Sequence, residues 1–210
     1  QIVNNSAELL RPLATLEMER ALAASTIHTD DTEVRLLTPG EGRGSRRGRL
    51  WIYLSDEAFS QYDVFAFTNS RARAGPDEFL RDFRGTICGD CYSGYVNIEQ
   101  VTGGRIAFAA CNAHARRRYV FNAREQDPVL SSHILGLYHL LYDVGERGRR
   151  LDAVERLLLR RRESVPLMGQ LEKVLWSAEA EKLLPKSKFG QAVGYMRNHW
   201  EALSRFLSDG

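Results

Sequence analysis

The chain has 210 residues, of which 43% are hydrophobic and 27% charged, and its formal net charge is +2. These values are ordinary for a soluble globular protein. No apolar run approaches the roughly 20 residues that a membrane span needs, and there is no signal-peptide pattern. We therefore expect a cytoplasmic protein with no membrane partner. Residue 1 is Gln rather than a start methionine, so we expect a piece of a longer protein.

Arginine is far more frequent than lysine and is concentrated in clusters. Guanidinium groups suit bidentate contacts with phosphate, so the clusters are compatible with nucleic-acid binding. The alternative interpretation is a set of solvated helix faces. The clusters lie at residues 43–49, 116–118, 147–150 and 160–162.

The first part of the chain predicts a helix and then a strand. Residues 5–24 have Leu and Met at helical spacing. Residues 26–37 alternate as a strand does, and residues 38–48 are rich in glycine and arginine, which predicts a turn. Alternate strand residues share one face of a sheet. On this strand one face carries His28, Asp30, Thr32, Val34 and Leu36.

Four further strands and one helix follow. Residues 50–54 and 64–68 predict antiparallel strands separated by turns. A helix opens at Pro76, and residues 85–90 and 105–111 predict the fourth and fifth strands. Three antiparallel strands, a helix and then parallel strands predict an α/β protein with a ribonuclease-H-like mixed sheet.

Everything after His114 predicts helices. Apolar residues recur at helical spacing in three stripes, which favours a separate helical bundle. The first stripe contains Leu130, Ile134, Leu137 and Leu141, the second Leu151, Val154, Leu157 and Leu158, and the third Phe189, Ala192, Val193, Met196, Trp200, Leu203, Phe206 and Leu207.

Two aspartates stand at or near the ends of predicted strands. Asp is unfavourable in strands, because its side chain competes for backbone hydrogen bonds. If the first and fourth strands are neighbours, Asp30 and Asp90 face each other about 5 Å apart. Carboxylates that close repel unless a cation lies between them, which suggests Mg²⁺ or Mn²⁺. The alternative is that both aspartates only cap turns.

Cysteine and histidine spacing permits a different metal site. The pairs Cys88–Cys91 and Cys111–His114 have a plausible spacing for tetrahedral zinc. The alternative is that Cys88 and Cys111 are small core residues on neighbouring strands. An extended strand favours the alternative, because it turns Cys88 and Cys91 to opposite faces.

A basic motif follows the fifth strand. His114, Arg116, Arg117 and Arg118 lie at the transition from a strand to a helix. Helix N-termini and arginine side chains both bind phosphate, so these residues are candidate DNA ligands. An exposed basic turn is the alternative.

Several motifs, in order along the chain, resemble the insertion sequence 66 transposase family. Each motif alone is weak, but their combination is specific. The family usually has Trp in place of Asn112. The matching segments are 28–40 (HTDDTEVRLLTPG), 48–53 (GRLWIY), 89–95 (GDCYSGY), 110–119 (ACNAHARRRY), 187–195 (SKFGQAVGY) and 205–210 (RFLSDG).

This resemblance implies a ribonuclease-H-like core with an Asp-Asp-Glu triad that binds a divalent metal. Asp30 matches the first acid and Asp90 the second, while Asp31 is the rival for the first position. We prefer Asp30 because it shares a strand face with Val34 and Leu36. The resemblance also implies a helical insertion, DNA partners (transposon ends and target) and, since transposases commonly act as multimers, a homo-oligomer associated with the nucleoid.

The third acid of the triad has no counterpart here. In the family it lies downstream of the Asp-Gly pair matched by residues 209–210, whereas Glu146, Glu163 and Glu181 lack its context. We therefore expect a transposase fragment that is inactive alone. The alternatives are a DNA-binding or regulatory remnant and a zinc-stabilised module. The expected divisions are an N-terminal helix (1–25), the catalytic core (26–125) and the helical insertion (126–210).

Overall fold

The computed structural model describes residues 2–37, 45–55 and 61–209. By its internal contacts the chain divides into two compact units, Gln1–Phe108 and Ala109–Gly210. The sequence analysis placed the division between the catalytic core and the helical insertion between residues 125 and 126. The structure includes residues 109–125 with the helices, because the segment Ala115–Phe121 packs against later helices of that unit.

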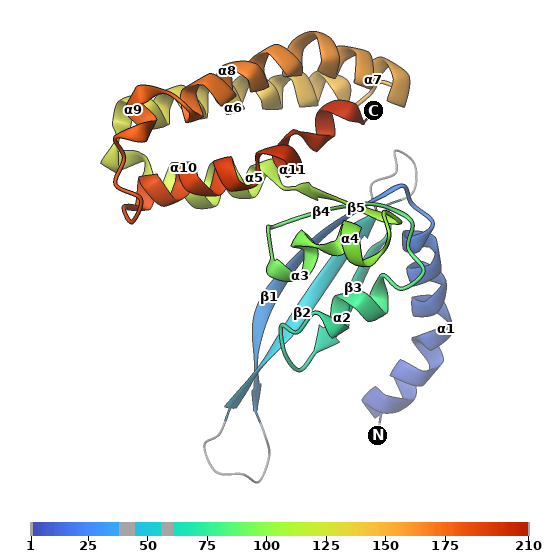
Figure 1. Ribbon diagram of the computed structural model, residues 1–210. Helices are drawn as coiled ribbons and strands as arrows, with labels where there is room; N and C mark the ends of the chain where they lie inside the picture. The colour runs from blue at the N-terminus through green and yellow to red at the C-terminus, as the bar shows by residue number, and fades with distance from the viewer. Residues whose placement is uncertain (1, 38–44, 56–60, 210) are drawn as a thin grey trace. The chain divides into compact units, whose positions relative to one another are not determined.

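A five-stranded mixed sheet forms the centre of the first unit (Figure 1). The strands are arranged in the order β3-β2-β1-β4-β5, so the first and fourth strands of the chain are neighbours. Their bounds are Thr26–Leu37 for β1, Ser45–Ser55 for β2, Asp63–Thr68 for β3, Gly85–Gly89 for β4 and Ile106–Ala110 for β5.

The strand directions are those predicted. β1 and β2 are antiparallel with Asp31 opposite Trp51, and β2 and β3 are also antiparallel. β1 and β4 are parallel, with His28 opposite Cys88. The predicted mixed α/β architecture is therefore confirmed, including the parallel pairing of β4 with the first residues of β1.

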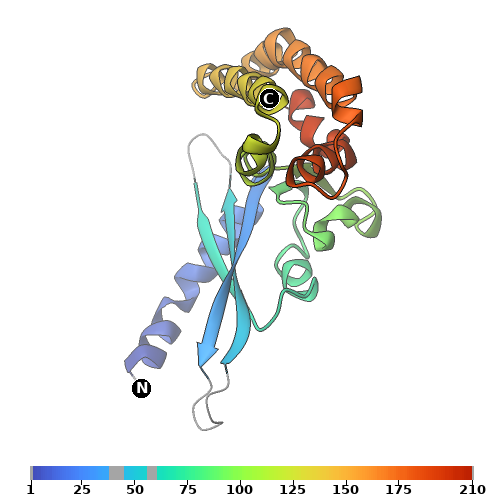
Figure 2. The ribbon, with the colours of Figure 1, turned by 90° about the vertical axis from the view of Figure 1, so that its left-hand side faces the viewer.

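Helices cover both faces of the sheet (Figure 2). On one face, α1 (Ile2–Leu22) packs against β2 and β3. On the other lie α2 (Ala74–Phe79), α3 (Ser93–Val96) and α4 (Ile98–Val101). The Tyr53 ring of β2 stacks on Phe79 of α2 at 3.7 Å. Since residues of one strand alternate between faces, the odd-numbered residues of β1 and β2 point toward α2 and α3.

The predicted first helix is confirmed, and one prediction for this unit was wrong in detail. The apolar residues of α1 are largely exposed, with Leu9 82% and Leu13 54% accessible. Residues 45–48 are strand rather than turn, because the β1–β2 ladder continues as far as the pair Leu37–Ser45. The remainder of the predicted turn, residues 38–44, lies outside the described residues.

The second unit is helical. Its main helices are α6 (Pro128–Gly148), α8 (Val165–Leu175) and α10 (Lys188–Asn198). Asp127 caps α6 by accepting a hydrogen bond from the Leu130 backbone N–H, and Pro128 occupies the first turn. Such caps satisfy backbone donors that the helix itself leaves unpaired.

Shorter helical segments precede, connect and follow these three helices. They are α5 (Asn112–His114), a π-helical segment (Ala115–Phe121), a 3₁₀ turn (Arg124–Gln126), α7 (Ala153–Leu159), a second π-helical segment (Arg160–Ser164), α9 (Ala178–Glu181), α11 (Trp200–Ser204) and a final 3₁₀ turn (Arg205–Ser208).

Two of the three apolar stripes form the core of this unit. The stripe of α6 is buried, as are Phe189, Met196 and Leu203 of the last stripe. The middle stripe was wrong in phase, because Val154 and Leu158 are exposed and Leu159 is buried instead. Within the described ranges, no helix has both the length and the apolar character needed to cross a bilayer.

Gly85 offers a test of the β1–β4 pairing. Its φ is +151°, and a Cβ there would overlap the backbone carbonyl oxygen of Ser25, at the start of β1. We expect Gly85→Ala to lower the free energy of unfolding by about 2 kcal/mol or more, because both the backbone and the space are unfavourable. Urea denaturation measures this change.

Gly103→Ala is the matched control. Gly103 also has a positive φ, +59°, but nothing lies within 4 Å of a Cβ placed there. This variant should lose only about 1 kcal/mol, the cost of the backbone conformation alone. Equal losses in the two variants would show that the close approach at Gly85 contributes nothing.

Candidate functional site

The candidate site centres on Asp31 in β1. Its side chain is only 2% exposed and accepts hydrogen bonds from two arginines. Arg71 approaches with its Nη2 2.7 Å and its Nε 2.9 Å from Oδ1. Arg49, on the neighbouring strand β2, places its Nη1 3.0 Å from Oδ2. A buried carboxylate is stable only when it is paired in this way.

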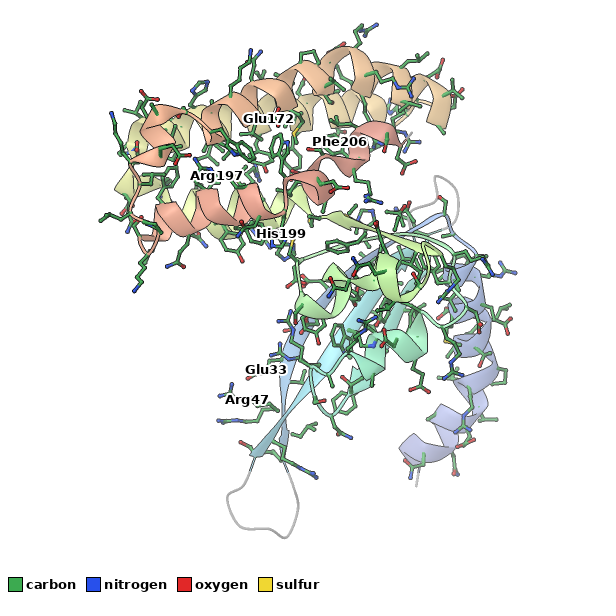
Figure 3. All side chains as sticks on the ribbon, viewed as in Figure 1. Glu33, Arg47, Glu172, Arg197, His199 and Phe206 are labelled. Carbon is green, nitrogen blue, oxygen red and sulfur yellow. The ribbon has the colours of Figure 1, made fainter. Side chains whose placement is uncertain are left out.

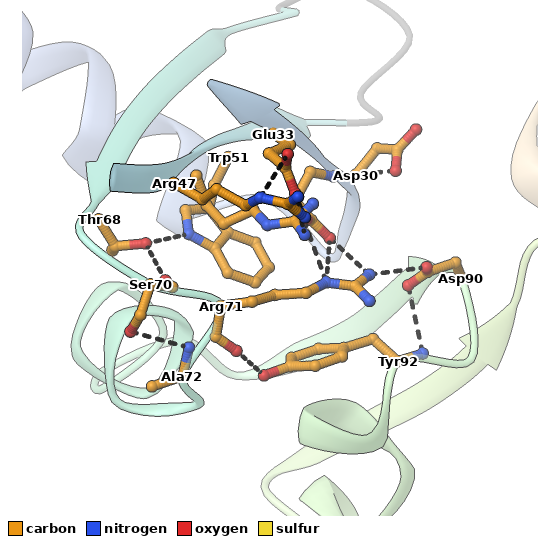
Figure 4. A network of polar contacts seen from close by, with 12 residues as sticks. Asp30, Glu33, Arg47, Trp51, Thr68, Ser70, Arg71, Ala72, Asp90 and Tyr92 are labelled. Carbon is orange, nitrogen blue, oxygen red and sulfur yellow. Dashed lines mark hydrogen bonds and ion pairs between the residues drawn. The ribbon is translucent and has the colours of Figure 1, made fainter. Parts of the chain in front are cut away.

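Asp90 joins the same cluster from the end of β4. Its Oδ2 lies 3.0 Å from the Nη2 of Arg71, and its Oδ1 accepts a hydrogen bond from the Tyr92 backbone N–H at 3.2 Å (Figure 4). The second bond is an Asx-turn, which fixes the direction of a short polar side chain. One guanidinium nitrogen therefore reaches carboxylates from two neighbouring parallel strands.

The segment between β3 and α2 positions Arg71. Trp51 donates its indole N–H to Thr68 Oγ1 at 2.8 Å, and the Thr68 hydroxyl donates to the Ser70 carbonyl at 2.6 Å. The Tyr92 hydroxyl donates to the carbonyl of Arg71 itself. The guanidinium lies over the Tyr92 ring, 4.4 Å from its centroid, in a cation–π contact.

Electrostatics and burial stabilise the charge of Arg71. Burial lowers the pKa of its guanidinium, but the hydrogen bonds and negative charge of Asp31 and Asp90 outweigh this effect and raise the pKa above its usual value. Beneath the cluster, burial raises the pKa of the Tyr95 phenol, whose oxygen lies 3.3 Å from Thr29 Oγ1. Tyr95 is itself part of the buried core, and its ring contacts those of Trp51 and Tyr92 edge-on.

A second layer of charge lies farther along the β1–β2 hairpin. Glu33 pairs with Arg49 at 3.3 Å and with Arg47 at 3.4 Å (Figure 3). These pairs are more exposed than the pair at Asp31 and are correspondingly weaker. Arg49 bridges the two layers, because it contacts both Asp31 and Glu33.

Asp30, our preferred first acid, does not belong to this cluster. It is exposed, and its Oδ1 accepts a hydrogen bond from the backbone N–H of Asp31 at 2.9 Å. Figure 4 shows its carboxylate directed away from Arg71 and Asp90. Adjacent strand residues point to opposite faces, so the structure brings Asp31 rather than Asp30 together with Asp90.

For the three cysteines and His114, a zinc site was the less favoured of our two interpretations. The described part of the chain contains no group of three or more His, Cys, Asp or Glu side chains that could hold a metal ion. Cys88 belongs to β4, Cys91 follows Asp90, and Cys111 follows β5. The zinc interpretation therefore finds no support in the geometry.

The basic motif lies in the helical unit. His114 ends α5, Arg116 places its guanidinium 4.8 Å from the centroid of the Tyr142 ring, and Arg117 is exposed. The side chain of Arg118 is outside the described part of the structure. The motif thus presents an exposed cation at Arg117, while Arg116 is at least partly engaged within its own unit.

The three glutamates considered for the missing acid also lie in the helical unit. Glu146 pairs with Arg149 at 3.2 Å and Glu181 with Arg197 at 2.7 Å. Hydrogen bonds from Arg147 and Arg162 lower the pKa of Glu163 to about 2. Part of the arginine clustering in this unit is therefore explained by intramolecular ion pairs.

Comparison with known sequences decides the family. The sequence profile of the Transposase IS66 family matches residues 1–210, the whole chain. The chain belongs to the IS66 family of transposases. The resemblance stated from the motifs is thereby confirmed, and the acidic cluster described above lies in a transposase sequence.

Three proteins of Sinorhizobium fredii are similar to this IS66 family member. The uncharacterized protein y4hP is 27% identical over 99% of this chain, y4qI is 29% identical over 96%, and y4jD is 25% identical over 96%. The chain spans about two fifths of the length of these relatives, whose matched shares are 40%, 39% and 41%.

Sequence reasoning missed Arg71, Arg49 and Tyr92 as members of the site. Arg71 follows β3 in a segment that carries no recognisable motif. Arg49 could have been found, because the hairpin register places it near Asp31 on the adjacent strand. Tyr92 stands in the quoted segment 89–95, but its bonds to Arg71 and Asp90 depend on how that turn folds.

The choice between the adjacent aspartates can be tested by stability. In this IS66 family member, Asp31→Asn should lower the free energy of unfolding by about 2 kcal/mol, because a neutral amide loses the charge-assisted hydrogen bonds that the buried carboxylate accepts from Arg49 and Arg71. Asp30→Asn, on the exposed side of the same strand, should change it by no more than about 0.5 kcal/mol. Urea denaturation compares the two, and a larger loss for Asp30→Asn would contradict the placement.

Proposed function

We propose that this chain is the catalytic part of a DNA transposase and that Asp31 and Asp90 are two of its catalytic acids. The observation that carries the proposal is the convergence of these carboxylates on one guanidinium, in a chain of the IS66 family. The strand order, with a parallel β1–β4 pair, is compatible with a ribonuclease-H-like fold, which we propose as well.

The two carboxylates are suited to a hard divalent cation. Mg²⁺ prefers oxygen ligands at about 2.0–2.1 Å and usually takes only one or two carboxylates, with water and phosphate completing its shell. Asp31 and Asp90 each have an oxygen within 3.0 Å of a single nitrogen atom. If the Asp31 and Asp90 oxygens moved slightly closer to each other, they would form a pair of ligands for Mg²⁺ or Mn²⁺.

The proposed reaction is in-line phosphoryl transfer in the intact protein. A water oxygen attacks a phosphodiester at the transposon end, the P–O3′ bond breaks, and a 3′-hydroxyl is released. That hydroxyl loses its proton and attacks a phosphodiester of the target DNA. A new P–O3′ bond joins the transposon end to the target 5′-phosphate, while the P–O3′ bond of the target breaks and its 3′-oxygen leaves as a protonated hydroxyl. A bound divalent cation would supply charge neutralisation at the reacting phosphate.

The residues of the chain would hold and orient the substrate. Asp31 presents its oxygens from a strand and Asp90 from the Asx-turn that follows β4, which limits the motion of whatever they bind. His114, Arg116, Arg117 and Arg118 would contact phosphates and so position DNA without reading its sequence. Self-association into a homo-oligomer remains part of the proposal for the intact protein.

Replacing the acids one at a time tests the assignment. In the intact transposase, Asp90→Asn and Asp31→Asn should each reduce DNA cleavage and strand transfer by at least about a hundredfold, because each removes a charged ligand. Asp30→Asn is the control and should retain most activity. Gel assays on labelled transposon ends measure both steps.

Two outcomes would contradict the proposal. Full activity of Asp90→Asn would remove the site from catalysis, and loss of activity only in Asp30→Asn would restore Asp30 as the first acid. An intact protein that binds DNA but never cleaves it with Mg²⁺ or Mn²⁺ would favour the DNA-binding remnant.

The basic motif is tested separately by the salt dependence of DNA binding. Each phosphate contact contributes a slope of about −0.9 to log K against log salt. Arg117→Gln should weaken binding to any DNA sequence and make the slope of log K against log salt less negative by about one. Fluorescence anisotropy over a KCl series measures it.

Arg11→Gln is the matched control, since it removes the same charge from an exposed arginine that pairs with Glu8 and lies outside the arginine clusters. This control should leave the slope nearly unchanged. Equal losses in the two variants would indicate a general charge effect rather than a contact at Arg117.

A further inference from the structure

Arg71 takes the place between the two carboxylates that the proposed function gives to a cation. Its Nη2 is 2.7 Å from Asp31 Oδ1 and 3.0 Å from Asp90 Oδ2, and its Nε makes two more contacts with Asp31. These charge-assisted bonds use the oxygen lone pairs that a metal ion would need. Guanidinium and metal ion therefore compete for the same atoms.

The cluster is unequally exposed. The Asp31 side chain is 2% exposed and that of Asp90 18%, whereas that of Arg71 is 37% exposed. Two carboxylates this close repel each other when no cation separates them. Arg71 supplies the missing charge from the solvent-facing side, so the pair can stay assembled without a metal.

The contacts of Arg71 allow its guanidinium to move while its backbone stays in place. The Tyr92 hydroxyl binds the Arg71 carbonyl, and Thr68 and Ser70 fix the preceding segment. The guanidinium end, by contrast, is held by the two carboxylates and by the face of the Tyr92 ring. Long arginine side chains can reorient about their own torsions without any change in the backbone.

We propose that Arg71 is the resident counter-ion of the Asp31–Asp90 pair and that a divalent cation must displace its guanidinium to bind there. This inference rests on the proposed function, because it assumes that the pair takes a divalent cation. It makes Arg71 a positioning residue. Arg71 keeps Asp31 and Asp90 in place and sets the metal concentration at which the two carboxylates bind a cation.

The test is Mn²⁺ binding to the 210-residue chain by titration calorimetry. Arg71→Gln should bind Mn²⁺ about tenfold more tightly than the wild type, because no charge-assisted hydrogen bonds then compete with the metal. Arg73→Gln is the matched control. Arg73 lies two residues away, pairs with Asp77 at 3.0 Å and carries the same charge. Its loss should change the affinity by no more than about twofold.

The outcomes separate this inference from the function on which it rests. Suppose that Asp90→Asn abolishes Mn²⁺ binding but Arg71→Gln binds Mn²⁺ no more tightly than wild type. The displacement of the Arg71 guanidinium by metal is then overturned, while the proposed metal site is supported. If neither the wild type nor Arg71→Gln binds Mn²⁺, both proposals are overturned.

A metal-free measurement covers the case in which Arg71→Gln is too unstable for calorimetry. Urea denaturation of Arg71→Met, which removes the charge but keeps a long side chain, of Asp90→Asn and of the double variant forms a double-mutant cycle. The counter-ion role predicts that the double variant is more stable than the sum of the two single losses implies, because each change removes the same interaction. Additive losses would overturn the role of Arg71 as counter-ion.

Discussion

A carboxylate that is almost fully buried in a sheet imposes a strict requirement on the residues around it. Asp31 has lost nearly all contact with water, and the cost of burying its charge is offset only by the two guanidinium groups that it contacts. Arg49 comes from the adjacent strand and Arg71 from the segment after β3. The positions of both are therefore tied to the hairpin register and to the Trp51–Thr68–Ser70 hydrogen bonds.

The parallel pairing of β1 and β4 gives this buried charge a second partner. It sets β4 beside the first residues of β1, and the Asx-turn at Asp90 directs that carboxylate to the guanidinium already bound by Asp31. Gly85 permits the pairing, because its lack of a side chain lets β4 start against the backbone of Ser25. The site thus follows from sheet topology and one tight turn rather than from a local motif.

Much of the fold could be predicted from the sequence, whereas the details of the site could not. Two-residue periodicity and turn residues indicated the five strands, and the ribonuclease-H-like arrangement implied that the first and fourth are neighbours. Periodicity also led to the preference for Asp30, because Val34 and Leu36 suggested a buried face. The opposite face carries the polar residues Thr29 and Asp31, yet Tyr95 and the arginines cover it. Coverage of a polar strand face by distant residues leaves no trace in local periodicity.

The spacing of the cluster along the chain has a consequence for synthesis. Asp31, Arg71 and Asp90 are separated by 40 and 19 residues, and the turn that directs Asp90 is complete only at Tyr92. Contacts between distant segments form late, because the chain between them must first be ordered. A nascent polypeptide that has emerged only as far as β3 carries Asp31 without Arg71 or Asp90, and so has no assembled acidic pair. The parts of the site become a unit only after nearly the whole sheet has left the ribosome.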